Sequence, residues 1–172
     1  KRFLLLCMFA ASSQAADPAV EGPKVIAEAF GRLSGALAES IAKNGAAGSI
    51  GVCHEKAPQI AKEVAQAHGV TLRRATEKPR NPKNAADALE KSILNAFAAS
   101  LAQNEAPKPK VLTEADGRRA FFAPIVLGNP LCLKCHGKLG EDIAPETHAA
   151  ILKLYPEDNA TGFKIGDLRG LW

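Results

Sequence analysis

Residues 132–136 read Cys-Leu-Lys-Cys-His, and this C-x-x-C-H motif constrains the fold more than any other feature of the chain. Two thiols three positions apart can add to the two vinyl groups of a haem, and the adjacent His then lies under the iron as an axial nitrogen ligand. We therefore predict one haem c per chain, bound covalently by Cys132 and Cys135 and ligated by His136. The low aromatic content of 5% is in keeping with a core in which the haem ring is the large flat element.

The motif has three other interpretations. The two cysteines can form a disulfide, since exported cysteines usually pair. They can be half of a zinc site, but such a site needs four ligands and only Cys53 with a distant His remains to complete it. A thioredoxin-like redox pair needs a preceding strand and a helix that opens at the first Cys. We expect a loop instead, because Gly137 follows the motif at once.

The start of the chain is typical of an export signal. A basic pair at residues 1–2 precedes an apolar run at 3–11 and a small-residue cleavage site at 13–15. The apolar run is too short to span a bilayer, which takes roughly 20 residues. An uncleaved anchor, or a lipoprotein attached through Cys7, is the alternative. We predict a periplasmic protein without a membrane span after cleavage, organised as a signal peptide at 1–15, a flexible lead at 16–23 and a single domain at 24–172.

The charge balance argues against a nucleic-acid partner. The whole chain has a net charge of +4, and removal of residues 1–15, which carry two basic and no acidic side chains, lowers it to +2. The remaining basic residues are scattered along the chain, whereas a nucleic-acid footprint is clustered. The same cleavage removes Met8, the only methionine, and therefore the usual thioether ligand of a c-type haem.

The hydrophobic pattern predicts an α+β fold with an antiparallel sheet, because helices come first and strands follow, mixed with helices. Pro58 must either kink the second helix or open a new one at its first turn. Asp116-Gly117 is a hairpin signal. The expected helices are 24–43, 49–68, 85–104 and 145–154, and the expected strands are 70–76, 110–114, 118–127 and 166–172. In the first helix, the apolar stripe consists of Ile26, Phe30, Leu33, Leu37 and Ile41.

The second axial position of the iron has several candidate ligands: Cys53, His54, His68 and His148. Cys53 shares the apolar stripe of its helix with Ala57, Ile60 and Val64, and so faces the core. His54 is about 100° further round the same helix. Geometry therefore favours Cys53, although a free Cys on such a stripe is as well explained as a small buried apolar residue.

Five segments, at 50–61, 80–87, 130–137, 155–162 and 166–170, resemble in the same order those of a bacterial family of single-haem c-type proteins with a PAS-like domain. They read IGVCHEKAPQIA, RNPKNAAD, PLCLKCHG, YPEDNATG and GDLRG. The resemblance implies a PAS-like antiparallel sheet with long N-terminal helices. It also implies His136 and Cys53 as the axial pair, since the family uses the Cys of its V-C-x-x-x-A-P segment.

Two functions follow from these expectations. The first is a haem-based redox or gas-responsive sensor that signals to a partner protein and binds a diatomic gas when reduced. The second is a small low-potential electron carrier. An enzyme is not expected, because a filled iron offers no resting site for substrate. Arg80 is a candidate propionate contact, with Arg74, Lys78 and Arg169 as weaker ones, and the long first helix is suited to a homodimer.

Overall fold

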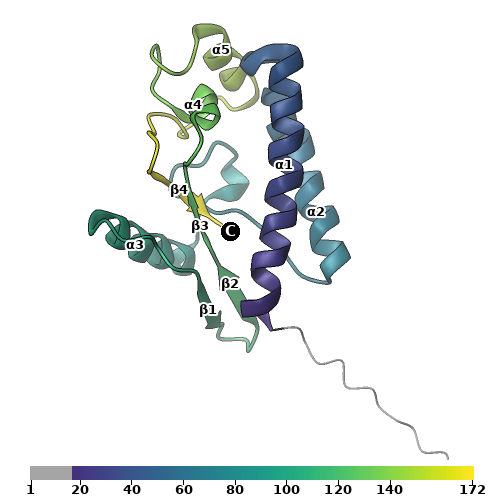
Figure 1. The fold of residues 1–172 in the computed structure, drawn as a ribbon, viewed down its shortest axis with the longest axis vertical. Helices are drawn as coiled ribbons and strands as arrows, with labels where there is room; N and C mark the ends of the chain where they lie inside the picture. The colour runs from purple at the N-terminus through teal and green to yellow at the C-terminus, as the bar shows by residue number, and fades with distance from the viewer. Residues whose placement is uncertain (1–16) are drawn as a thin grey trace, which may run out of the picture.

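The computed structural model describes residues 17–172, and Figure 1 shows their arrangement. The predicted signal peptide lies outside the described residues. The helices are α1 (Pro18–Gly48), α2 (Ala57–His68), α3 (Ala88–Ala102), α4 (Pro130–His136) and α5 (Pro145–Leu154). A π-helical turn, η1 (Val52–Lys56), precedes α2, and a 3-10 turn, η2 (Pro82–Asn84), precedes α3. The strands are β1 (Lys110–Thr113), β2 (Arg119–Phe122), β3 (Pro124–Val126) and β4 (Leu168–Leu171).

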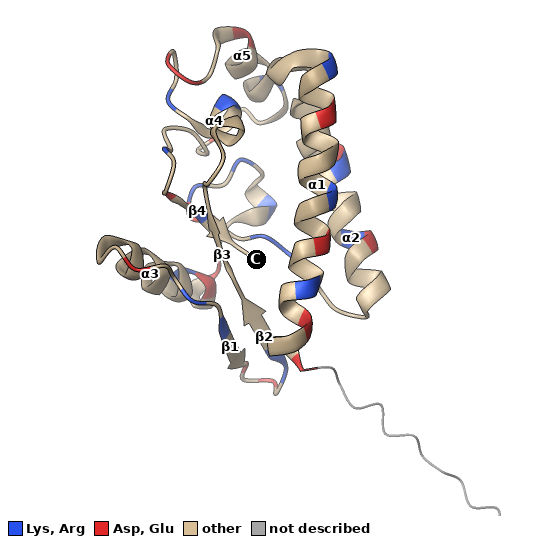
Figure 2. Cartoon of the chain, viewed as in Figure 1, with Lys and Arg blue, Asp and Glu red and all other residues tan. Residues whose placement is uncertain are grey.

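Helix α1 begins earlier than the sequence pattern predicted. Asp17 is its N-cap, and the side chain accepts a hydrogen bond from the backbone N–H of Ala19 at 3.1 Å. The flexible lead predicted for residues 16–23 is therefore wrong from Pro18 onward. The buried face of α1 carries Val25 and Ala29, and Phe30 on the predicted stripe is 57% exposed. Both signs of charge alternate along α1, as Figure 2 shows.

The first helix, expected over residues 24–43, is kinked just beyond its expected end and continues to Gly48. Gly45 has φ 68° and ψ 178°, which breaks the helical path before its last short piece. Pro58 then lies in the first turn of α2, where a missing N–H costs nothing. Just before it, the N–H of Ala57 bonds to the carbonyl of Val52, five residues back, which closes the π turn η1.

The strands form two separate antiparallel pairs, β1 with β2 and β3 with β4. The single long strand predicted at 118–127 is divided at Ala123, whose N–H and carbonyl both bond to Trp172. The strand predicted at 70–76 is absent: this segment forms only two isolated bridges, of Ala75 with Leu171 in β4 and of Thr76 with Ala85. The fold class is α+β, with smaller sheets than expected.

The β3–β4 pair separates two apolar clusters. Ile125 and Trp172 pack on Val25 and Val64 of the α1–α2 layer. Leu171 faces the other way, because successive side chains of a strand alternate, and joins a cluster that includes Ile93, Leu94 and Phe97 of α3. In Figure 1 this ribbon lies between α3 and the α1–α2 pair, with α4 and α5 beyond its end.

The remaining helices follow their local signals. Asp87 and Glu90 form a capping box at the start of α3, and α5 has the predicted bounds. Within residues 17–172, every helix is too short or too polar to span a bilayer.

Candidate functional site

The C-x-x-C-H motif forms helix α4, so the loop expected at this place is wrong. Asn129 caps the helix by accepting the backbone N–H of Leu131 at 2.8 Å, and Pro130 occupies the first turn. Residues three apart share one face of a helix, so Cys132 and Cys135 point to the same side. Local cap signals, present in the sequence at Asn129-Pro130, predict this helix better than the position of Gly137 does.

The structure bears on the alternative interpretations of the motif. Cys53, Cys132 and Cys135 are free thiols, so no disulfide joins them. In the part of the chain that is described, no three His, Cys, Asp or Glu side chains group closely enough to hold a metal ion. Burial raises the pKa of Cys135 to about 11, which is opposite to the lowered pKa of a reactive redox thiol.

His136 is oriented by the protein backbone. Its Nδ1 lies 2.8 Å from the carbonyl oxygen of Ala160 and 3.4 Å from Nε of Arg169. One nitrogen cannot both donate to the carbonyl and accept from the guanidinium, and the shorter contact, to an atom that only accepts, places the proton on Nδ1. Burial, with the nearby charges of Arg169 and Arg80, holds the pKa of His136 well below its usual range. The imidazole is thus neutral, with the lone pair on Nε2.

Cys53 lies in the π turn η1. It is partly buried, and burial raises the pKa of its thiol against the opposing charges of Arg74 and Arg80. Charge on Cys53 in turn raises the pKa of Cys135, so the two thiols are electrostatic neighbours although 82 positions separate them. Sequence spacing alone predicts neither the π turn nor this proximity.

The other ligand candidates lie differently. His54 is exposed, with its ring edge-on to Tyr155 at a centroid distance of 5.2 Å. His68 is paired with Glu28, a residue of α1, at 2.9 Å between Nε2 and Oε2. Neither contact involves the motif itself. His148 lies within α5, partly buried.

Arg80 is buried and bonded to the protein. Its Nε and Nη2 atoms donate to the two carboxylate oxygens of Asp158 at 3.0 and 3.1 Å, and Nη2 also donates to the carbonyl of Cys135 at 2.5 Å. The side chains of Arg80 and Asp158 are only 8% and 1% exposed. These contacts fix the end of α4 to Asp158 through Arg80. The role of Arg80 as a propionate contact stays a prediction.

Two further guanidinium groups converge on this interior without a carboxylate. Arg74 forms no hydrogen bond or ion pair with any residue of 17–172, and its guanidinium lies over the Trp172 ring, 5.5 Å from the ring centroid. Arg169 donates to the hydroxyl of Thr76 at 3.0 Å and the carbonyl of Lys78 at 3.2 Å, both uncharged. Burial, followed by repulsion from Arg80 and Arg74, lowers the pKa of Arg169 to about 10. Asp158 offsets one of the three arginines, which leaves two positive charges uncompensated.

The model of the Tll0287-like family, described as Tll0287, matches residues 11–172. The chain belongs to the Tll0287-like family. Among solved structures, it is similar to one described as the crystal structure of the cyanobacterial heme-protein Tll0287, with a TM-score of 0.68 and 29% sequence identity. That match covers 91% of this chain and 93% of the other. None of the curated proteins compared with the chain matches it.

In this Tll0287-like chain, the sequence did not predict Tyr155 as a residue of the site. Tyr155 caps α5 and packs with Cys135 and Ile50 in a buried cluster. Burial, and then the charge of Cys53, raises the pKa of its phenol. The only sequence signal for Tyr155 is its place at the head of the segment 155–162, which also supplies Asp158 and Ala160.

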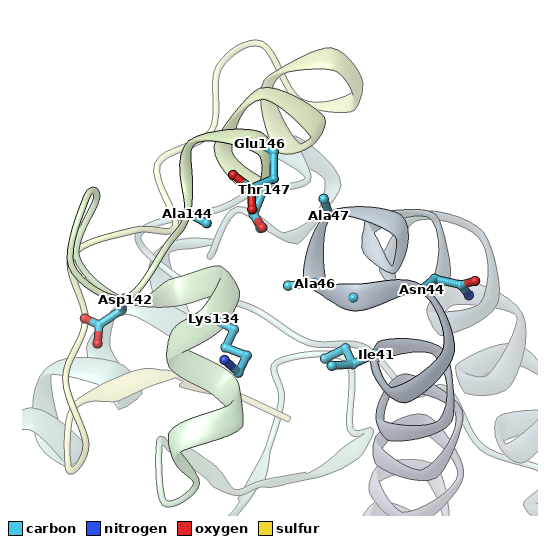
Figure 3. A pocket seen from close by; sticks show the side chains of 10 residues that line it. Ile41, Asn44, Ala46, Ala47, Lys134, Asp142, Ala144, Glu146 and Thr147 are labelled. Carbon is cyan, nitrogen blue, oxygen red and sulfur yellow. The ribbon is translucent and has the colours of Figure 1, made fainter.

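The two cavities that we describe lie beside the cysteines and not on them. The first, of about 380 Å³, lies between the end of α1, α4 and the start of α5, with Ile41, Lys134 and Thr147 in its lining (Figure 3). Lys134 is about 160° round α4 from both Cys132 and His136, so this cavity is on the far face of the helix. The second, of about 260 Å³, is lined by Lys78, Phe163 and Arg169.

Proposed function

We propose that this chain is a periplasmic monohaem c-type cytochrome that acts as a haem-based redox or gas-responsive sensor. One observation carries the proposal: two free thiols on one face of α4 are followed at once by a neutral His136 whose Nδ1 is held by Ala160. This is the tautomer that binds a metal through Nε2, with the second nitrogen fixed by a backbone carbonyl. The match to a structure described as a heme-protein supports the same cofactor.

The residues present fit a haem c. Cys132 and Cys135 would hold it through thioethers, and His136 and Cys53 would be its axial ligands. When bound, the haem supplies a one-electron couple and, with one axial side open, a place for a diatomic gas. We propose a binding and redox role and not catalysis, because Cys53 and His136 would fill both axial positions. The PAS-like description of the domain belongs to this proposal as well.

The charge of the interior fits the same group. A haem carries two propionates, and Arg74 and Arg169 are two guanidinium groups without a carboxylate partner in residues 17–172. A guanidinium matches a carboxylate in shape and charge, and an unpaired one is costly to bury. We therefore assign the propionates to Arg74 and Arg169 ahead of Arg80, which Asp158 already engages.

Cys53 is the residue that gives a sensor its response. Its surroundings favour the neutral thiol, since burial raises its pKa. A thiolate at Sγ is favoured beside a ferric iron, whose charge compensates it, and disfavoured once that charge falls on reduction. On reduction, a proton from solvent would neutralise Sγ and release Cys53 from this role, which would leave room for a gas and free the π turn η1 to reorganise.

The alternative is a small low-potential electron carrier. It is favoured by one specific contact path: Arg169 touches Nδ1 of His136 at 3.4 Å and the carbonyl of exposed Lys78 at 3.2 Å, so the predicted ligand is close to the surface. A redox partner would dock there. A carrier keeps both ligands in both redox states, whereas a sensor exchanges one.

The test compares the parent protein and Cys53→Ala, both matured with haem, as ferric and ferrous forms with and without carbon monoxide. We expect the parent to bind carbon monoxide only after reduction and the variant to have an altered ferric spectrum and a higher reduction potential. Ferrous parent protein that refuses carbon monoxide supports the carrier. A variant with the parent's ferric spectrum and potential overturns Cys53 as a ligand.

A further inference from the structure

The cavity of about 380 Å³ between the end of α1, α4 and the start of α5 combines an apolar wall with charged groups. The wall on the α1 side consists of Ile41, Ala46 and Ala47. In Figure 3, Lys134 extends from α4 toward the end of α1, and Thr147 lies at the start of α5. The cavity shares no lining residue with the haem site described above, so its groups need a separate explanation.

One part of the cavity is positive. Lys134, which lines it, forms no ion pair or hydrogen bond with any residue of 17–172. The start of α5 borders the same space, and its N-cap, Ala144, has no side chain that could accept the first N–H groups of the helix. These N–H groups carry the positive end of the helix dipole. An ammonium and a helix start are thus both without a partner here.

Thr147 adds a buried donor to this part of the cavity. Only 2% of its surface is exposed, and its hydroxyl forms no hydrogen bond with any residue of 17–172. Among those residues, every fully enclosed polar side-chain atom does have a partner. The Thr147 hydroxyl is therefore not enclosed, and its accessible surface is in the cavity that it lines. A hydroxyl held in this way is available to a hydrogen-bond acceptor on a bound molecule.

The cavity also has a negative part. Asp142 and Glu146 both line it, and neither forms an ion pair with Lys134. Oδ2 of Asp142 accepts the backbone N–H of Lys138 at 2.9 Å, whereas the carboxylate of Glu146 has no partner among residues 17–172. A simple anion would be repelled by the carboxylates and a simple cation by Lys134. A ligand that carries both charges would satisfy both parts.

We propose that this cavity binds a small zwitterion of the α-amino acid class with an apolar side chain. The ligand's carboxylate accepts hydrogen bonds from Lys134 and from the Thr147 hydroxyl, and its ammonium pairs with Glu146. Thr147 and Glu146 are consecutive residues, which suits the short separation of the two charged groups in an amino acid. The ligand's side chain packs on Ile41 and Ala46. This inference does not rest on the proposed function.

The test is isothermal titration calorimetry of the full chain, matured with haem, with L-leucine as the probe. We expect saturable binding. Two analogues keep the leucine side chain: 4-methylpentanoate lacks the amino group, and 3-methylbutylamine lacks the carboxylate. Each should bind about tenfold more weakly or worse, because it leaves one charged part of the cavity unpaired. An analogue that binds as tightly as L-leucine overturns the zwitterion, and no binding of L-leucine overturns the site.

Two variants test whether binding occurs in this cavity. Lys134→Met and Thr147→Val each remove one contact to the carboxylate, and we expect each to weaken L-leucine binding by about tenfold. Thr147→Val keeps the branched shape of the side chain, so the test stands if Lys134→Met fails to fold. Lys138→Met is the matched control, because Lys138 is paired with Glu141 and does not line the cavity. Parent affinity in both variants, or an equal loss in the control, overturns the assignment.

Discussion

The Nδ1 atom of His136 lies 2.8 Å from the carbonyl oxygen of Ala160, in a loop 24 residues further along the chain. The same loop is joined to the site a second time, because Asp158 accepts the N–H of Ala160 at 3.0 Å and pairs with Arg80. Arg80 in turn holds the carbonyl of Cys135. One buried ion pair thus sets the position of both the motif and the carbonyl that orients its histidine.

The Arg80–Asp158 pair should be a major contribution to stability. Asp158→Asn leaves a buried guanidinium uncompensated, and we expect the free energy of unfolding of the haem-free chain to fall by about 3 kcal/mol. Urea denaturation measures it. The control is Glu39→Gln, which removes an ion pair to Lys43 whose two side chains are each 67% exposed and should change stability little. Equal effects of the two substitutions would contradict this role of the Arg80–Asp158 ion pair.

The two motif cysteines should be necessary for attachment and Cys53 should not. We expect Cys132→Ser with Cys135→Ser to abolish haem that survives denaturing electrophoresis, because no thioether can form. Cys53→Ser should keep it, since Cys53 is an axial ligand only. Haem staining of the gel gives the result. Retention of haem by the double variant would show that other residues attach it.

Arg74 should have opposite effects in the two forms of the protein. Arg74→Met removes an uncompensated, partly buried guanidinium, so we expect the haem-free chain to gain about 1 kcal/mol. In the haem-loaded protein, loss of a positive charge beside a propionate should lower the reduction potential. Arg118→Gln, on the exposed β1–β2 hairpin, should change neither quantity. A haem-loaded potential equal to that of the parent would remove Arg74 from the propionate site.

Gly170 allows the strand that carries Arg169 to approach its neighbour closely. A Cβ atom at this position would lie 2.5 Å from the carbonyl oxygen of Ala75, a backbone atom that cannot move away. We expect Gly170→Ala to lower the free energy of unfolding by about 2 kcal/mol or more. Gly51→Ala, where a Cβ meets nothing within 4 Å, should be neutral or slightly stabilising. Chemical denaturation of both variants tests the difference.

Much of the fold could be predicted from local signals. Helix periodicity located α2, α3 and α5, the Asp116-Gly117 dipeptide located the β1–β2 hairpin, and Asn44-Gly45 located the kink in α1. These signals act within a few residues of the chain. The start of α1 was missed because the helix contains Pro23, and the helix α4 was missed although Asn129-Pro130 is a good start signal.

The parts that could not be predicted depend on contacts between distant residues. The segment 70–76 has the alternation of a strand, but only Ala75 pairs with Leu171 because the chain crosses the sheet at this one place. In the site, the sequence identified Cys132, Cys135 and His136 through their spacing. The sequence did not predict that Tyr155 lies beside the turn that carries Cys53. It also did not predict that Arg74 has no partner among residues 17–172. Both features depend on tertiary packing.

The most direct test of the central claim is an optical and EPR spectrum of the chain matured with haem, taken oxidised and then reduced. We predict covalent haem with a low-spin thiolate signature in the ferric state, and loss of that signature on reduction, with an open side that binds carbon monoxide. A ferric spectrum typical of nitrogen ligation would show that the ligand is His54 and not Cys53. Protein without covalent haem would contradict the account, and Cys132 and Cys135 would then be an ordinary pair of thiols.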